Sequence, residues 1–326
     1  MNPFVCCQVT GKWHNFPVRA FTNKGSFSLT LGAALGLALV AAVIVAPVAA
    51  MAVRAAGFRF PFPRIFDRTV MVALFATLLL FARRLELMDF LRQGFGLARN
   101  GFWQAVSGLA LAAGIIAVLF ALASVAGGHI RGSVIVTSVL LYLPAAVLIA
   151  ILEEGFFRAF LLAGIASDIG PSGALLASSA VFALAHVMRS SARFFLTSFE
   201  PTAGLQNLAA CAERILYPEV RPPLLGLFLL GLLLGEAFVV TRRVYCSLGL
   251  HTGFVLGAKT WRLAAGGPIP RWLAGPGSVP LMAAPAAWAI SAIALIIMPL
   301  LLRPTVAGAP VLGGNDQIRF LAKRER

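Results

Sequence analysis

The sequence predicts an all-α, polytopic transmembrane helix bundle of about eight spans with one additional interfacial helix. Of its 326 residues, 60% are hydrophobic and only 12% are charged, and the mean hydropathy is +0.89. Soluble globular chains carry about 25% charged residues. Apolar runs long enough to cross a bilayer recur along the chain and are separated by charged or Pro- and Gly-containing segments. The composition therefore excludes an ordinary soluble domain.

Residues 1–130 are predicted to form an N-terminal membrane extension that begins with a basic tail. The first span is Phe27–Val53, and its small residues from Gly32 to Gly36 permit a close helix contact. The second, Thr69–Ala82, is short. In Arg83–Asn100 apolar and charged residues are mixed, which predicts a helix lying in the membrane interface. The third span follows from residue 105 to residue 127.

Residues 134–262 are predicted to form a helical core. Its first segment, Val134–Ala166, is too long for one straight crossing, so we expect a break or bend at Pro144. Proline is favoured at a helix start, and Pro171 is predicted to open a helix that runs through His186 to about Met188.

The second half of the core begins with Arg189–Arg221, which mixes acidic and basic residues and predicts a loop or amphipathic cover that gates access to the bundle. Two spans follow, at Pro222–Val240 and Val244–Trp261. Residues 263–326 are predicted to hold the last span, Leu281–Leu302, and a basic C-terminal tail.

The formal charge is +15, from 27 Lys and Arg against 12 Asp and Glu. The basic residues lie mostly between apolar segments, which predicts contacts with anionic membrane lipids rather than with nucleic acid. With an even number of spans both termini share one side, and the basic tail favours the cytoplasm. We expect a multi-pass protein of the bacterial inner (plasma) membrane.

Glu153, Glu154 and Arg158 are the costliest residues to place, because they lie within an apolar run. If Ala145–Ala166 is one helix of 22 residues, each ionised glutamate near its middle costs about 2.5–3.5 kcal/mol on insertion scales. Glu154 and Arg158 are four residues apart and share a helix face. Glu153 lies about 100° round the helix. It has no basic residue three or four positions away, so its charge must be met from another helix.

Two histidines are placed to meet that charge. His186 and His251 lie in apolar runs, whereas His14 and His129 lie in connections. One carboxylate and two imidazoles can form a three-ligand zinc site with an open position, its ligands being Glu153, His186 and His251. They can equally form a carboxylate base with imidazole partners. Either arrangement activates water.

Structural readings compete with these functional ones. A buried Glu–Arg pair can fix helix register, and a lone histidine in an apolar helix is often a core hydrogen-bond donor. The coincidence of two Glu, one Arg and two His in three helices favours a site. Glu236, near the end of a span, is an outside candidate. Neither a His-Glu-x-x-His motif, a Gly-x-Ser-x-Gly turn nor a nucleotide-binding Gly-x-x-x-x-Gly-Lys loop occurs in the sequence.

Three motifs in order resemble the CPBP family of intramembrane proteases, which includes the CAAX prenyl endopeptidases. They are Glu153-Glu154-x-x-x-Arg158, Phe182-x-x-x-His186, and a Gly-rich helix leading through Ser247-Leu248-Gly249-Leu250 to His251. The resemblance extends from Pro144 to Trp261 and implies that residues 134–262 are a catalytic helical core. It implies an intramembrane endopeptidase acting on a membrane-associated protein or peptide, for which a lipid-modified CAAX protein is one candidate.

The resemblance also implies a role for each site residue. Glu153 would activate water with help from His186. Glu154 and Arg158 would shape the site and hold substrate or each other, and His251 would stabilise the oxyanion or bind a metal. The family uses an Asn or Asp four residues after the last histidine, where this sequence has Val255. That role would then pass to a backbone amide or to Arg158.

Two other functions remain open at this point. One is a non-catalytic membrane scaffold or bacteriocin-immunity-type protein on the same fold, which would keep the buried charges for structure. The other is a transporter with Glu153 and His186 as a proton relay. No pair of matching interrupted helices supports the transporter.

Overall fold

A computed structural model describes residues 26–188, 194–275 and 281–301. It confirms the all-α class, since the regular elements of these residues are helices apart from two strands of two residues each. The elements in order are α1 (Phe27–Ala55), α2 (Phe62–Leu80), α3 (Leu87–Gly94), α4 (Gly101–Val125), β1 (His129–Ile130), α5 (Ser133–Glu154), η1 (Gly155–Leu162), α6 (Ala163–Val187), α7 (Ala203–Arg214), η2 (Pro218–Val220), α8 (Arg221–Thr241), α9 (Tyr245–Ala264), β2 (Ala265–Gly266), α10 (Arg271–Ala274), η3 (Leu281–Ala283) and α11 (Pro285–Leu301).

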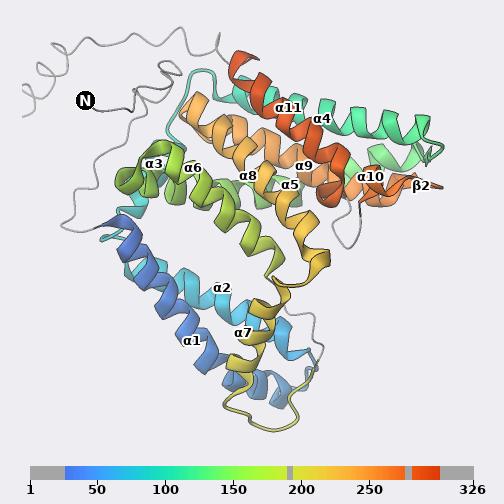
Figure 1. Ribbon diagram of the computed structural model, residues 1–326. Helices are drawn as coiled ribbons and strands as arrows, with labels where there is room; N and C mark the ends of the chain where they lie inside the picture. The colour runs from blue at the N-terminus through green and yellow to red at the C-terminus, as the bar shows by residue number, and fades with distance from the viewer. Residues whose placement is uncertain (1–25, 189–193, 276–280, 302–326) are drawn as a thin grey trace, which may run out of the picture.

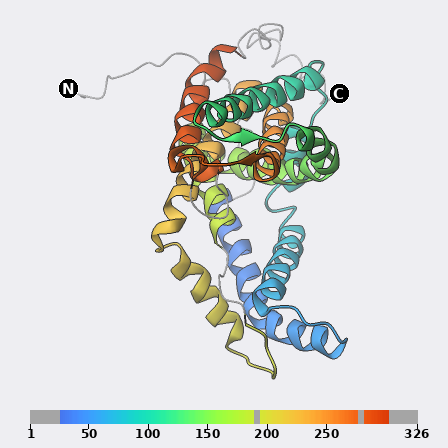
Figure 2. The same ribbon diagram turned by 90° about the vertical axis from the view of Figure 1, so that its right-hand side faces the viewer.

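The helices form a bundle and an arm (Figure 1). The bundle contains α3 to α6 and α8 to α11, whereas α1, α2 and α7 project from it as the arm, which hangs below the bundle in Figure 2. Each part has its own apolar core. The core of the bundle includes the first turns of α1, while a smaller cluster lies further along the arm and comprises Ala46, Ala50, Phe62, Phe66 and Ala203.

Four helical segments among the described residues are long and apolar enough to cross a membrane. They are α1, α4, the continuous stretch Ser133–Val187, and Pro218–Thr241, which contains α8. The remaining predicted spans correspond to α2, α9 and α11, of which α11 is a shorter apolar helix. These segments mark the chain as an integral membrane protein.

The helical stretch Ser133–Val187 departs from the predicted course in two places. The α-helix continues through Pro144, so the predicted break is not there. Instead, the helix widens to a π-helix over η1, immediately after Glu154. A second change of direction occurs at Gly170, whose φ of 77° belongs to the left-handed region that favours glycine. A new helix then begins at Pro171, as predicted, and carries His186 in its last turn.

Close helix packing occurs between α4 and α9 rather than at the predicted position in α1. Gly32 and Gly36 are exposed, with no neighbouring atom within 4 Å of an added Cβ, so the close contact that these glycines permit is not formed within the described residues. On α4, a Cβ at Gly108 would lie 2.0 Å from the Cys246 carbonyl oxygen, and on α9 a Cβ at Gly249 would lie 1.9 Å from that of Ala105. The two backbones therefore touch, which fixes α9 against α4.

The root of the arm is attached to the bundle by a carboxylate. Asp168 of α6 accepts hydrogen bonds from the Ser26 hydroxyl at 2.7 Å and from the Ser28 and Phe27 amides at 2.7 and 3.2 Å. A carboxylate satisfies the unpaired amides at a helix N-terminus and complements its dipole. The Phe27 ring lies so close to Gly164 that a side chain there would overlap it.

The two segments with mixed apolar and charged residues, Arg83–Asn100 and Arg189–Arg221, each contain a helix that packs against other helices of the chain. The helix expected within Arg83–Asn100 is α3, and its Phe90 ring meets those of Phe27 and Phe160 at 5.6 and 6.3 Å. The predicted cover contains α7, whose Gly204 lies against the backbone of Val43 in α1. Residues 189–193 of that cover lie outside the described residues.

The α4–α9 contact predicts a position-specific cost for side chains on α4. We expect Gly108→Leu to destabilise the protein by about 1–3 kcal/mol, because the added atoms force two backbones apart. Gly114→Leu on the same helix meets open space and is the matched control. Thermal unfolding in detergent, followed by circular dichroism, measures both. Equal melting temperatures for the two variants would contradict the packing described here.

Candidate active site

Glu153 and Glu154 are the last two residues of α5, at the junction with η1. A π-helical turn inserts an extra residue into the helix and is frequent at functional sites. Here the π-helix buries a run of consecutive side chains, from Phe157 to Leu162, in the bundle. The side chain of Glu154 is 0% exposed and that of Glu153 is 27% exposed. The two adjacent carboxylates therefore meet different surroundings.

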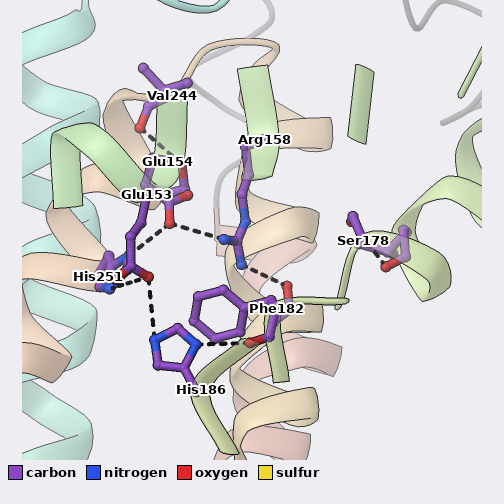
Figure 3. A network of polar contacts seen from close by, with 11 residues as sticks. Glu153, Glu154, Arg158, Ser178, Phe182, His186, Val244 and His251 are labelled. Atoms are coloured by element: carbon purple, nitrogen blue, oxygen red, sulfur yellow. Dashed lines mark hydrogen bonds and ion pairs between the residues drawn. The ribbon is translucent and has the colours of Figure 1, made fainter. Parts of the chain in front are cut away.

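The charge of Glu154 is met entirely inside the bundle. Its Oε1 lies 3.2 Å from Nη1 of Arg158 and 2.7 Å from Nδ1 of His251. Nη2 of Arg158 donates to the Gly231 carbonyl of α8 at 3.2 Å. The guanidinium also lies over the Phe182 ring, 4.7 Å from its centre. One ion pair thus connects η1 with α6, α8 and α9 (Figure 3).

Glu153 faces both membrane histidines. Its Oε2 lies 3.4 Å from Nε2 of His186 and 3.8 Å from Nε2 of His251, and Figure 3 shows the three side chains directed toward one another. This oxygen is buried and makes no hydrogen bond to any other part of the chain that the structure describes. The predicted need for a partner from another helix is therefore met from α6 and α9 together.

The other nitrogen of each imidazole determines which nitrogen carries the proton. Nδ1 of His186 lies 2.8 Å from the Phe182 carbonyl oxygen, and Nδ1 of His251 lies 2.7 Å from the Glu154 carboxylate. Both partners only accept hydrogen bonds, so both Nδ1 atoms are donors. In the neutral imidazoles the Nε2 lone pairs then point toward Glu153. Three acceptor atoms converge, and a water molecule placed among them can donate its two protons to two of them at a time.

The same donor types suit zinc, with Glu153, His186 and His251 as ligands and with the Phe182 carbonyl and the Glu154 carboxylate accepting from the two Nδ1 atoms. As the side chains stand, no group of three or more His, Cys, Asp or Glu residues that could hold a metal ion is found in the described part of the chain. The chemistry below is therefore derived from the carboxylate and the imidazoles.

The structure brings together all five residues that the sequence singled out, and it adds contacts that the sequence did not reveal. Phe182 both accepts from Nδ1 of His186 and packs its ring 4.4 Å from the imidazole centre. Its position four residues before His186 was the available signal. The link between His251 and Glu154 had no such signal, since 97 residues separate them. The outside candidate, Glu236, is buried in α8 at 8% exposure.

Val255 lies one turn after His251 in α9 and has no side-chain donor. The Arg158 guanidinium is buried and contacts Glu154 and the Gly231 carbonyl. His251 is the side chain of the site whose Nε2 faces Glu153 while a buried carboxylate holds its Nδ1. It is therefore the better candidate for stabilising negative charge.

The different surroundings of the two glutamates predict different effects on stability. We expect Arg158→Met to destabilise the protein by about 3–5 kcal/mol, because it leaves the Glu154 carboxylate buried without its cation. Adding Glu154→Gln should recover part of that loss. Glu153→Gln should change stability little. Unfolding temperatures in detergent compare the variants, and an Arg158→Met protein as stable as the parent would rule out a structural role for the ion pair.

Comparison with known proteins agrees with the resemblance carried by the motifs. Residues 135–257 match the model of the family described as Type II CAAX prenyl endopeptidase Rce1-like. The matched segment contains Glu153, Glu154, Arg158, His186 and His251. No curated protein and no solved structure matches the chain.

Proposed function

We propose that this chain is an intramembrane endopeptidase that hydrolyses a peptide bond in a membrane-associated protein or peptide. The observation that carries the proposal is the convergence of Glu153 Oε2 with Nε2 of His186 at 3.4 Å and of His251 at 3.8 Å. The family match over residues 135–257 supports the reaction class. A scaffold or immunity protein would need buried pairs such as Glu154–Arg158, but it would not need a second carboxylate facing two imidazoles.

In the proposed first step, Glu153 removes a proton from water as the water oxygen bonds to the scissile carbonyl carbon. The carbonyl π electron pair moves to its oxygen, which becomes an oxyanion. His186 holds the water through Nε2, and its own orientation is fixed by the Phe182 carbonyl. General base catalysis of this kind contributes about 10²–10⁴-fold to a rate.

His251 is proposed to stabilise the oxyanion. A proton taken up from bulk water at Nε2 before the reaction, and kept there throughout it, makes His251 a donor to the oxyanion. The Glu154 carboxylate at Nδ1 stabilises this cation, as the buried aspartate does for the histidine of a serine protease triad. In the second step the carbonyl re-forms, the C–N bond breaks, and the proton held by Glu153 passes to the leaving nitrogen. The hydroxyl proton of the new carboxylic acid then passes to the amine, so that the products are a carboxylate and an ammonium group.

We further infer that the substrate is presented from the membrane, as a peptide or protein with or without an attached lipid, and that lipids rather than nucleic acid surround the chain. The apolar helices and the net charge of +15 support this. We assign the protein to the bacterial inner membrane as part of the same proposal, which membrane fractionation of the producing cell tests.

Cleavage of a membrane-anchored reporter library by the purified protein in liposomes tests the reaction. We expect Glu153→Gln and His186→Ala each to lower the cleavage rate by about 10²–10⁴-fold. His129→Ala, which changes a histidine of β1 distant in sequence from the site, is the matched control and should leave the rate unchanged. Folded Glu153→Gln and His186→Ala proteins that still cleave would refute these assignments.

Metal dependence is a separate question, and the placement of the donors favours catalysis by Glu153 and the histidines without zinc. We therefore expect dialysis against a chelator to leave the cleavage rate unchanged. Elemental analysis of the purified chain provides a second readout. A stoichiometric zinc signal that is lost in the His186→Ala, His251→Ala double variant would establish these residues as ligands and overturn the expectation.

A further inference from the structure

A groove between α1 and α2 lies beside the turn that joins the two helices of the arm. It encloses a cavity of about 540 Å³. Valines and an alanine of α1 line one wall, Ile65, Thr69 and Val72 of α2 line the other, and the side chains of Arg64 and Arg68 lie at the same cavity. A cavity of this size accommodates one ligand of moderate size. We propose that the groove binds one anionic phospholipid.

The two arginines supply the charge that would select an anionic headgroup. Arg64 and Arg68 are four residues apart on α2 and therefore share a helix face. Arg64 lies over the Phe60 ring at 5.3 Å, and Arg68 contacts the Met71 sulfur at 3.3 Å. Within the described residues neither has an ion pair with a carboxylate. Guanidinium groups suit phosphate, which they bind through two parallel hydrogen bonds.

The surrounding turn has an excess of positive charge. Between residues 54 and 68 the sequence contains four arginines and a single acid, Asp67. Asp67 lines an adjacent cavity together with both Arg64 and Arg68, so one acid stands against the four arginines of this segment. Basic residues close to a bilayer surface attract anionic lipids by about 1 kcal/mol each. Charge complementarity therefore favours phosphate over a neutral headgroup.

The apolar walls determine how the lipid would lie. Val45, Ala49 and Val53 repeat every four residues along α1 and rise by roughly 12 Å from first to last. At the turn, Phe58 and Phe60 are exposed and their rings stack at 6.1 Å, as expected of side chains at the level of lipid headgroups. The phosphate would lie at the turn beside the arginines, and an acyl chain would run along the walls toward Val45.

This lipid site would be separate from the catalytic residues but adjacent to their helix. The second cavity that Arg64 and Arg68 line has a volume of about 470 Å³ and extends to Ala185 and Met188, on either side of His186 in sequence. This second cavity therefore extends from the arginines beside the headgroup to the end of the helix that carries His186. The inference does not depend on the proposed peptidase activity, because it rests on the arm alone.

Native mass spectrometry of the delipidated full chain in detergent tests the proposal. The probes are phosphatidylglycerol and phosphatidylcholine with identical acyl chains. We expect one phosphatidylglycerol to bind each chain with at least tenfold preference over phosphatidylcholine. Arg64→Gln with Arg68→Gln should weaken its binding on the order of tenfold to thirtyfold, the effect of two basic residues near a membrane surface. Equal binding of the two lipids would overturn the proposal.

Two sets of control variants distinguish lipid binding in the groove from unspecific attraction to positive charge and from binding of a phosphate group alone. Arg83→Gln with Arg84→Gln removes the same charge beyond the other end of α2, where Arg84 lies over Phe81 as Arg64 lies over Phe60, and should leave binding unchanged. Ala49→Trp and Val72→Trp fill the groove from opposite walls and keep both arginines. Each folded tryptophan variant should lose the lipid. Retention of the lipid by these variants, displacement of the lipid by millimolar inorganic phosphate, or an equal loss in the Arg83, Arg84 control would refute a lipid groove.

Discussion

The burial of one carboxylate, Glu154, constrains most of the bundle. Its charge is stable inside an apolar assembly only while Arg158 and His251 both contact it, at 3.2 and 2.7 Å. Arg158 in turn needs the Gly231 carbonyl and the Phe182 ring. These contacts require α6, α8 and α9 to approach η1 at defined positions. Because a buried unpaired charge costs several kcal/mol, the ion pair favours this arrangement of helices over alternative packings.

The surroundings of Glu153 depend on the same arrangement of helices, but Glu153 is not enclosed by it as Glu154 is. It is partly exposed, and its neighbours are the Nε2 atoms of two imidazoles whose Nδ1 atoms are held elsewhere. His251 contacts both glutamates, because its Nε2 faces Glu153 and its Nδ1 contacts Glu154. The fully buried carboxylate thus orients a side chain that faces the partly exposed one. Two identical residues next to each other in the sequence acquire different roles because they point about 100° apart.

Much of the site could be predicted from spacing and surroundings. Glu154 and Arg158 are four residues apart, and His186 and His251 are conspicuous in apolar runs. The π-helix at Gly155 could not be predicted, because an argument from periodicity assumes a regular α-helix and the insertion of a residue leaves no trace in the composition. The position of close helix packing could not be predicted either. Gly32 and Gly108 are both small residues in apolar helices, but only Gly108 lies against the backbone of another helix. Contacts between distant segments, such as His251 with Glu154, depend on the assembled fold.

Because α1 is attached to the bundle at Asp168, a small rotation at this end of the helix moves its other end by several ångströms. The helix has 29 residues and begins at the carboxylate, while the turn with Arg54 and Arg59 lies at its far end. Such a helix is about 44 Å long, so a rotation of about 5° at its root displaces the tip by about 4 Å. Three hydrogen bonds to one side chain thus determine where a distant turn meets the bilayer.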